Sequence, residues 1–211
     1  MDTEKYQCEL THLQLYPSND PNNVTEFVVA LSSVTAVSPS SSDKIGSTAF
    51  PMHVLLDSGT SLTRLPQDLV NEIYNEVGAT FDSNGNPLVA CTQSSSKSYF
   101  SFGFGGPNGA VVNVYMSELV IPGAVGKLSG NSNCGEDASL FGIFPVDSKS
   151  TTQHLILGDI FLRSAYVVYD LSPTVFNATS SNVVAFASSR AQHLRRVKGM
   201  LPYKRRLLRR R

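Results

Sequence analysis

The sequence of 211 residues has little cysteine, little charge and no long apolar run. Its three cysteines are too few for a dense disulfide scaffold. No apolar run approaches the roughly 20 residues that a membrane-spanning helix needs. The charged residues that closely follow Met1 predict no secretory signal peptide. With 41% hydrophobic and 16% charged residues, the composition favours a globular domain over a disordered chain or a coiled coil.

The motifs of several enzyme classes are absent as well. The four histidines (His12, His53, His154 and His193) show no paired ligand spacing, and no cysteine lies near another, so we expect no metal site. The glycine-rich stretch 103–109 lies between predicted strands and lacks a lysine, unlike a phosphate-binding loop. No G-x-S-x-G sequence occurs, which argues against a serine nucleophile. We therefore expect neither a metal nor a cofactor.

The formal net charge of zero hides two dissimilar segments. Ten of the seventeen lysines and arginines lie in residues 190–211, which contain no acid. Residues 1–189 keep seven basic and seventeen acidic residues, a net charge of −10. Gly199 and Pro202 interrupt any helix in the basic segment, which we expect to be a disordered tail. Nucleic-acid or membrane binding by this tail is the function that we favour least.

The body, residues 1–189, reads as one mainly β domain. Short stretches rich in β-branched and aromatic residues alternate with Gly, Pro, Ser and Asn, which is typical of many short strands. The predicted strands are 27–37, 50–56, 99–104, 110–115, 140–144, 155–157, 165–169 and 183–186. The predicted turns and loops are 38–42, 82–87, 94–96 and 105–109.

One clear helix is predicted, over residues 66–77. Pro66 suits the first helical turn, and Asp68 favours an N-terminus. Four apolar residues recur on one face: Leu69, Val70, Ile73 and Val77. Gly78 follows, as is common at a helix C-terminus.

The stretch Val54-Leu-Leu-Asp57-Ser-Gly-Thr-Ser61 places an acid at the end of an apolar strand. The residues after Asp57 supply hydroxyl groups, amide donors and a glycine that permits a sharp turn. Together they can hold a half-buried carboxylate in one orientation, which suits a catalytic acid. The same five residues, 57–61, also fit an aspartate that only begins a turn and accepts hydrogen bonds from the neighbouring hydroxyl groups.

Three segments carry a family resemblance: residues 5–10 read KYQCEL, residues 55–61 read LLDSGTS, and residues 155–171 read LILGDIFLRSAYVVYDL. They resemble, respectively, the K-Y-x-G-x-L opening, the second D-[ST]-G-[TS] motif and the apolar-apolar-Gly element of pepsin-type aspartic proteases, with Cys8 in place of a glycine. The likeness is to the C-terminal lobe of the fungal secreted (candidapepsin-like) and yapsin-like enzymes. It covers about residues 5–187 and implies, for 1–189, a single lobe of the bilobal pepsin-like fold.

The resemblance implies an aspartic-type endopeptidase. These enzymes hydrolyse peptide bonds with two aspartates, one per lobe, that share a water and a proton. Asp57 matches the catalytic aspartate of the C-terminal lobe. The resemblance further implies that Ser58 bonds across the lobe interface, and that Gly59, Thr60 and Ser61 support the active site.

Substrate-binding positions also follow from the resemblance. Tyr6, Leu55 and Ile156 fall where the family lines its primed-side pockets. Ordinary packing within the lobe explains Leu55 and Ile156 equally well.

The sequence departs from the family because it contains no second D-[ST]-G and no segment that resembles the flap. Without a second aspartate, the division into one acid and one base is lost. We therefore expect a partner, either a missing N-terminal lobe or a second copy of this chain.

The cysteines and the glycosylation sequons indicate the cellular compartment of the protein. Cys91 and Cys134 lie where the family has the disulfide of this lobe, although two buried thiols remain an alternative. Cys8 is left over. Asn23-Val-Thr and Asn177-Ala-Thr are glycosylation sequons. A persistent disulfide needs an oxidising compartment, so we expect a secreted or cell-surface protein.

Four functional hypotheses remain open from the sequence. The first, which we favour, is one lobe of an aspartic endopeptidase that acts on peptides at acidic pH only with a second lobe. The second is a homodimeric protease with one Asp57 per chain. The third is a catalytically inactive lobe that binds peptides or proteins, and the fourth is binding through the basic tail.

Overall fold

The computed structural model describes residues 6–16, 26–46, 49–107, 109–121, 138–146, 155–169 and 183–189. The basic tail lies outside these residues, so its predicted disorder stays a prediction. Within them, no helix has the length and the hydropathy that crossing a membrane requires.

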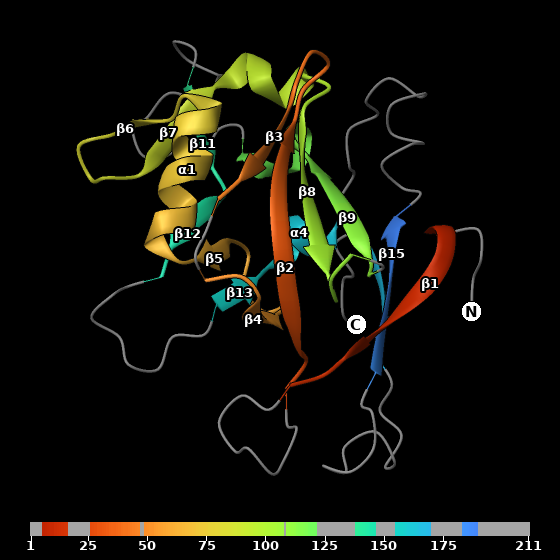
Figure 1. The fold of residues 1–211 in the computed structure, drawn as a ribbon. Coiled ribbons are helices and arrows are strands. Elements are labelled where there is room, and N and C mark those ends of the chain that lie inside the picture. The colour runs from red at the N-terminus through yellow and green to blue at the C-terminus, as the bar shows by residue number, and fades with distance from the viewer. Residues whose placement is uncertain are drawn as a thin grey trace, which may run out of the picture.

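The largest sheet has eight strands (Figure 1). Asp57 directly follows one of them, β4 (Met52–Leu56). Its order is β12-β5-β13-β4-β2-β8-β9, with β3 paired to β2. The strands are β2 (Val28–Val37), β3 (Ser42–Ile45), β4 (Met52–Leu56), β5 (Thr63–Leu65), β8 (Tyr99–Phe104), β9 (Val111–Tyr115), β12 (Ile143–Pro145) and β13 (Leu155–Leu157). Most neighbours are antiparallel, but β13 runs parallel to β4 and β12 runs parallel to β5. The β13 pairing brings the 155–157 segment beside the strand that precedes Asp57.

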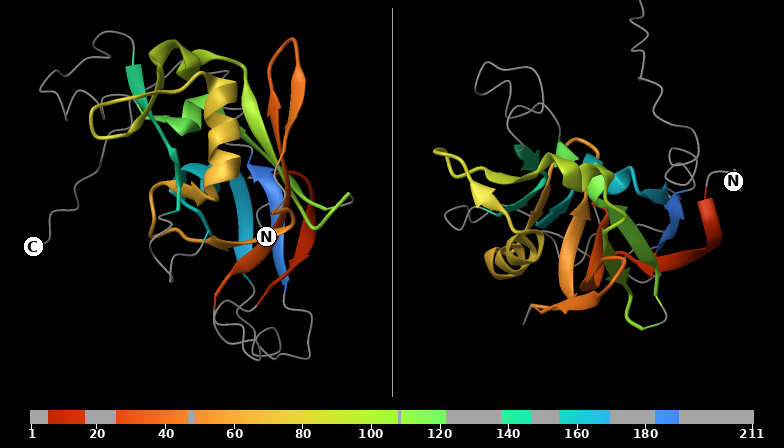
Figure 2. Two further views of the ribbon diagram at one scale, coloured as in Figure 1. Left: turned by 60° about the vertical axis from the view of Figure 1, so that its left-hand side comes forward. Right: turned by 90° about the horizontal axis from the view of Figure 1, so that it is seen from above.

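The described part of the chain also forms two smaller antiparallel sheets. One has the order β1-β15-β14, with β1 (Tyr6–Gln14), β15 (Val183–Ser189) and β14 (Ala165–Tyr169). The other has the order β10-β11-β7-β6, with β10 (Val120–Ile121), β11 (Ala138–Phe141), β7 (Pro87–Ala90) and β6 (Thr80–Phe81). Figures 1 and 2 show the β1–β15 pair on the side of the molecule away from α1 (Gln67–Val77).

Helix α1 forms where the sequence predicts a helix. Its cap is Pro66, and it ends at Gly78, whose φ of 62° is in the left-handed region that glycine adopts without strain. Its buried residues are Leu69, Val70, Ile73 and Tyr74. Tyr74 joins the predicted apolar face, and its hydroxyl donates a hydrogen bond of 2.9 Å to the carbonyl of Ile143. The other helical elements of the described residues are short: η1 (Cys91–Ser95, a 3-10 helix), α2 (Met116–Leu119) and α4 (Asp159–Leu162).

The core lies on one face of the large sheet because its strands alternate. In β8, Phe100, Phe102 and Phe104 are buried and the intervening residues are partly exposed, as the period of two requires. Phe102 and Phe104 meet Phe161 of α4 edge-on, with ring centroids 5.3 and 5.8 Å apart. These aromatic contacts fix α4, and hence the segment that precedes it, against the sheet.

The predicted strand 140–144 is wrong as a single element. The chain forms β11, breaks at Gly142 and continues as β12 in a different sheet. Gly142 bonds through its N–H to the carbonyl of Leu119 at 2.8 Å, and its carbonyl accepts from the N–H of Thr63 at 3.1 Å. A Cβ at Gly142 would lie 2.5 Å from Cδ1 of Ile160 and 3.2 Å from the carbonyl oxygen of Leu119, so a side chain here would require Ile160 to move.

The loop predicted at 94–96 is corrected in part, since Ser94 and Ser95 belong to the 3-10 helix η1. The other predicted strands that lie in the described residues are confirmed, with shifts of up to three residues at their ends. The predicted serine loop 38–42 is the turn between β2 and β3, with Ser42 already in β3. There Ser38 Oγ accepts from the N–H of Ser41 at 3.0 Å.

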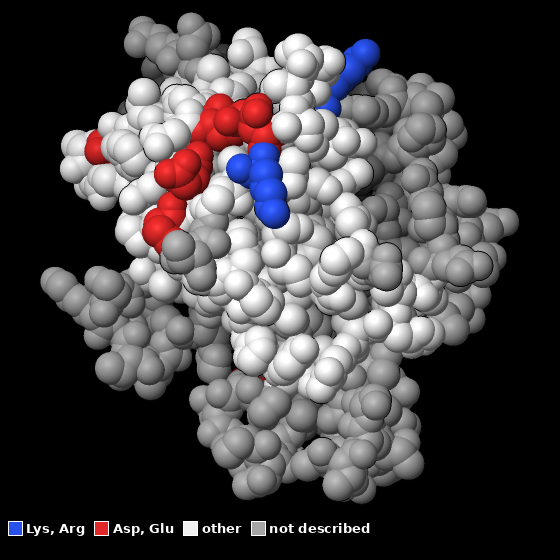
Figure 3. All heavy atoms as spheres, viewed as in Figure 1, with Lys and Arg blue, Asp and Glu red and all other residues white. Residues whose placement is uncertain are grey.

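Acidic side chains gather on one face of the molecule (Figure 3). The exposed acids of α1 and β3 are Asp43, Asp68, Glu72 and Glu76. Lys44 of β3 is also exposed. This distribution agrees with the negative charge of the body.

The aromatic cluster leads to a stability prediction. Phe161 is 1% exposed, whereas Phe81 is 57% exposed at the end of β6. Replacing Phe161 by Ala should lower the free energy of unfolding by about 3–5 kcal/mol, because a large cavity opens between α4 and β8. Phe81→Ala, the matched control, should cost about 1 kcal/mol or less. Urea unfolding followed by circular dichroism measures both values, and equal losses would contradict this account of the core.

Candidate active site

The candidate site is built where β4 and β13 end side by side. In the parallel register, Leu55 pairs with Ile156 and Leu56 pairs with Leu157. The pairing continues one step further, since the N–H of Asp57 donates to the carbonyl of Leu157 at 3.2 Å. Asp57 is therefore fixed by the sheet itself at its backbone.

Two neighbours hold the half-buried carboxylate of Asp57. The N–H of Gly59 donates to Oδ1 at 2.8 Å, and the hydroxyl of Thr60 donates to Oδ2 at 2.5 Å. Each oxygen has one donor, so the plane of the carboxylate is set. A Cβ at Gly59 would lie 3.1 Å from Oδ1, which makes glycine the best fit at this close approach. The arrangement leaves lone pairs on both oxygens for a water or a substrate proton.

Gly158 lies where the end of β13 meets the loop that follows Asp57. A Cβ there would lie 2.5 Å from the carbonyl oxygen of Thr60 and 2.3 Å from that of Leu62, so the two backbones approach too closely for any side chain. The next N–H groups then bond to the Asp57 loop. Asp159 donates to the carbonyl of Thr60 at 2.8 Å, and Ile160 donates to that of Ser61 at 3.2 Å. Helix α4 thereby fixes the loop that carries the carboxylate.

The other predicted support residues differ in what they contact. Ser61 takes part through its carbonyl, as given above, while its side chain is exposed. Ser58 is exposed as well, and its predicted bond across a lobe interface would reach outside this chain, so it stays a prediction.

The predicted pocket residues Leu55 and Ile156 lie side by side. Both are half-buried, whereas the next residues along their strands, Leu56 and Leu157, belong to the core. Leu55 and Ile156 therefore share the face of the sheet opposite the core. Tyr6 is the first residue of β1, in the smaller sheet, and its role stays a prediction.

Tyr169 is a residue near Asp57 that the sequence analysis missed. It ends β14, and burial together with the negative charge of Asp57 raises the pKa of its hydroxyl. Its ring meets that of Phe27 edge-on, with centroids 4.4 Å apart. Phe27 is tied to the site in turn, because its carbonyl accepts from the N–H of Leu56 at 3.0 Å. Tyr169 lies in the 155–171 motif, but its place beside Asp57 depends on long-range folding that no local signal reveals.

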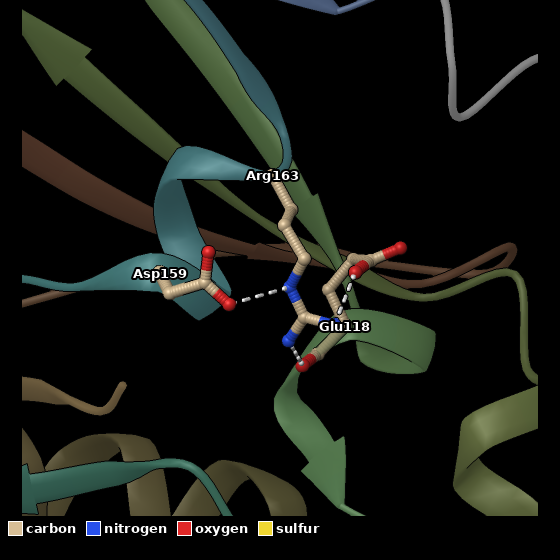
Figure 4. A network of polar contacts seen from close by, with 3 residues as sticks. All are labelled: Glu118, Asp159 and Arg163. Atoms are coloured by element: carbon tan, nitrogen blue, oxygen red, sulfur yellow. Dashed lines mark hydrogen bonds and ion pairs between the residues drawn. The ribbon is translucent and has the colours of Figure 1, made fainter. Parts of the chain in front are cut away.

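Arg163 links α4 to α2 through its contacts with Asp159 and Glu118 (Figure 4). Its Nε lies 3.5 Å from a carboxylate oxygen of Asp159, and its Nη1 lies 3.4 Å from one of Glu118 in α2. Its Nη2 also donates to the carbonyl of Glu118 at 3.4 Å. The side chain of Glu118 is only 8% exposed, so this pair is shielded from solvent on one side. This network joins α2 to α4. It helps to position the site and has no part in its chemistry.

Several predicted residues lie outside the described residues, namely Cys134, Asn23 and Asn177. The pairing of Cys91 with Cys134 therefore stays a prediction. Sγ of Cys91 lies 2.8 Å from Oγ of Ser139 in β11. In the described part of the chain, no group of three or more His, Cys, Asp or Glu side chains could hold a metal ion.

Comparison with known proteins assigns the family. A family model described as eukaryotic aspartyl protease matches residues 1–179. The chain belongs to the eukaryotic aspartyl protease family. Asp57 and its supporting loop lie within the matched residues, as does Gly158.

Relatives of this aspartyl protease chain include fungal proteins. It is 39% identical over 194 residues to the probable aspartic-type endopeptidase opsB of Aspergillus oryzae, covering 87% of this chain and 37% of that protein. It is 34% identical over 171 residues to aspartic proteinase 3 of Saccharomyces cerevisiae, covering 78% and 27%. The chain thus spans well under half the length of these relatives.

The fold also matches that of a solved aspartic proteinase. The crystal structure of the aspartic proteinase from Irpex lacteus superimposes with a TM-score of 0.60 at 20% sequence identity, over 90% of this chain and 49% of that one. The mainly β, pepsin-like fold that the sequence predicted is confirmed.

The close approach at Gly158 generates a prediction for this aspartyl protease chain. Gly158→Ala should lower the free energy of unfolding by roughly 1–3 kcal/mol, because its Cβ would meet backbone oxygens that cannot rotate away. Gly46→Ala is the matched control, since a Cβ there meets nothing within 4 Å and its φ is not in the left-handed region. Chemical denaturation measures both variants, and a Gly158→Ala protein as stable as Gly46→Ala would contradict the observed packing.

The proximity of Tyr169 to Asp57 can be measured directly. Asp57→Asn removes the nearby negative charge but keeps the burial, which is the larger cause of the raised pKa. The pKa of Tyr169 should therefore fall and yet stay above its ordinary value. The control is Tyr74, whose pKa burial alone raises to about 12 and which should not respond. Titration of ¹³C-labelled tyrosine rings by NMR reports both groups, and an unchanged Tyr169 would place Asp57 too far away to act on it.

Proposed function

We propose that this chain is one lobe of an aspartic-type endopeptidase and that Asp57 is its catalytic carboxylate. The observation that carries the proposal is the pair of donors on Asp57, from the Gly59 N–H and the Thr60 hydroxyl, in a chain of this family. A carboxylate fixed in this way at the end of a strand can hold a water molecule in one place. Orientation of this kind is a large part of catalysis.

The proposed reaction needs two carboxyl groups that share one proton. Two carboxylates a few ångström apart resist double ionisation, so one is the base while the other is the acid. The base takes a proton from water as the water oxygen bonds to the peptide carbon, and the acid protonates the carbonyl oxygen. In the resulting diol the C–N bond breaks, the nitrogen takes the proton that the base accepted, and a hydroxyl proton returns to the acid.

The second carboxyl group is proposed to come from a partner. The sequence contains one D-[ST]-G motif, and the chain spans 37% of the Aspergillus oryzae relative. An N-terminal lobe is the source that we favour. A second copy of this chain would supply the same group, as Asp57 of the other subunit. We propose that such a partner and a peptide contact the exposed Ser58 and the half-buried Leu55 and Ile156.

The proposal also includes the cellular compartment of the protein. We infer a secreted or cell-surface protein, stabilised by a Cys91–Cys134 disulfide and glycosylated at Asn23 and Asn177. The support is the cysteine pairing that the family resemblance implies, together with the two sequons.

The test compares three forms of the protein for hydrolysis of a peptide mixture between pH 3 and 7. They are the chain alone, the chain mixed with an N-terminal lobe, and a fusion in which the chain replaces the matching segment of the Aspergillus oryzae relative. We expect acid-pH cleavage in at least one form. Asp57→Asn should reduce kcat by about 10²–10⁴-fold, the usual contribution of a positioned acid or base. The matched control is Asp43→Asn, an exposed aspartate on β3, which should leave kcat unchanged.

The three forms also separate the alternatives. Activity of the chain alone that rises with the dimer fraction on a sizing column would assign the second carboxyl group to another copy. Cleavage that survives Asp57→Asn would refute the proposal. A folded fusion that binds peptides without cutting them would indicate the binding lobe instead.

A further inference from the structure

One charged side chain lies in the apolar surface beside the catalytic loop. Arg64 of β5 pairs with Ile156 of β13, and Ile156 pairs with Leu55 of β4. On the far side of β5, Phe144 of β12 pairs with Arg64. Paired residues of neighbouring strands lie on the same face of a sheet. These four residues, here called the outer row, therefore run across four adjacent strands.

Burial shows that the outer row faces away from the core. Its four members are all half-buried. The residues on either side of Arg64, Thr63 and Leu65, are 1% and 0% exposed. Because side chains alternate along a strand, Arg64 lies on the opposite face from Thr63 and Leu65. Leu55, two residues before Asp57, places the other end of the row beside the catalytic loop.

The guanidinium group of Arg64 is poorly satisfied within the described residues. Its one hydrogen bond is donated by Nη1 to the carbonyl of Pro145 at 3.5 Å, the long end of the range. The ion pairs between described residues involve Arg163 and not Arg64. A guanidinium group has five N–H donors and keeps its charge at any pH where proteins fold. A half-buried cation with one weak contact favours an external anion.

Arg64 is within reach of a peptide bound at Asp57. Strands β5 and β4 are separated by β13, so their backbones lie about 10 Å apart. An extended peptide advances about 3.3 Å per residue, so three residues span the same distance. A substrate that crosses the outer row therefore brings one side chain near Arg64 within about three residues of the cleaved bond. The intervening surface, Leu55 and Ile156, is apolar.

We propose that Arg64 is a specificity-determining residue that selects a substrate with an Asp or Glu side chain at that position. The inference rests on the proposed endopeptidase function and names a substrate class for it. A carboxylate can accept two parallel N–H bonds from the guanidinium fork, which a neutral amide cannot match in strength. Leu55 and Ile156 then accommodate an apolar residue nearer the cleaved bond. The favoured substrates are peptides that combine an apolar and an acidic residue on one side of that bond.

The test measures a ratio rather than an absolute rate. A substrate series carries Glu, Gln or Lys at each of four positions on either side of the bond, with amidated C-termini so that the side chain is the source of the carboxylate. At one position we expect kcat/KM to be about tenfold higher for Glu than for Gln. Arg64→Gln should abolish this ratio, Arg64→Glu should reverse it in favour of Lys, and Arg64→Lys should reduce it. The ratio within one variant does not depend on the fraction of protein that is folded.

Binding supplies a second readout that needs no cleavage. The 211-residue chain with Asp57→Asn is titrated with fluorescein-labelled Glu and Gln peptides, and the same preference for Glu is expected. Lys44→Gln, which removes an exposed cation on β3, is the matched control and should keep the preference. One further peptide, with a free C-terminus in place of the Glu side chain, tests recognition of a terminal carboxylate. Stronger binding of that peptide than of the Glu peptide would overturn the side-chain assignment.

The outcomes separate the two proposals. Cleavage or binding without any Glu preference, or with a preference that persists in Arg64→Gln, overturns the role of Arg64 and leaves the endopeptidase function intact. Neither cleavage nor binding in any form of the protein overturns the function, and the specificity proposal with it.

Discussion

The site depends on the close approach of Gly158 to the loop that carries Asp57. The carbonyl oxygens of Thr60 and Leu62 lie where a side chain at residue 158 would begin. That contact lets the 155–162 segment run beside β4 and then turn into α4, whose first N–H groups bond to the same loop. A loop after a strand is usually the mobile part of a fold. Here both of its ends are held by backbone hydrogen bonds.

The chemistry follows from this constraint. Because the backbone around Asp57 is fixed, the short bonds from Gly59 and Thr60 set the plane of the carboxylate instead of following a mobile group. Buried aromatic contacts to Phe161 and the Arg163 ion pairs fix α4 against the sheet and against α2. The same parallel pairing of β4 and β13 aligns Leu55 with Ile156, the two residues that we propose to contact the peptide. The position and orientation of the Asp57 carboxylate and the alignment of Leu55 with Ile156 thus follow from the same packing of the 155–162 segment beside β4.

Local patterns predicted what is local. The helix 66–77 is predicted by its proline, its apolar face and its glycine, and the loop after Asp57 by its hydroxyl residues and its glycine. What failed depends on contacts between distant segments. Gly142 ends a strand because its N–H and its carbonyl form hydrogen bonds with Leu119 and Thr63, which are distant in the sequence. No residue near position 142 indicates these partners. Tyr169 meets Phe27 through a ring contact, and Arg64 pairs with Ile156 of a strand far along the chain, so no local pattern predicts these neighbours. The family resemblance predicts a catalytic role for Asp57, which the five-residue pattern by itself left open.

The central claim is that Asp57 provides one half of a shared carboxyl pair that binds the reacting water. A peptide analogue with a hydroxyl group in place of the cleaved bond imitates the reaction's intermediate and should bind tightly. The decisive measurement is a crystal structure of the active form of the protein with this analogue bound. The account predicts that the hydroxyl lies within hydrogen-bond distance of a carboxylate oxygen of Asp57 and of one from the partner. A hydroxyl that binds elsewhere, with Asp57 bonded only to its own loop, would contradict the account and reduce Asp57 to a turn residue.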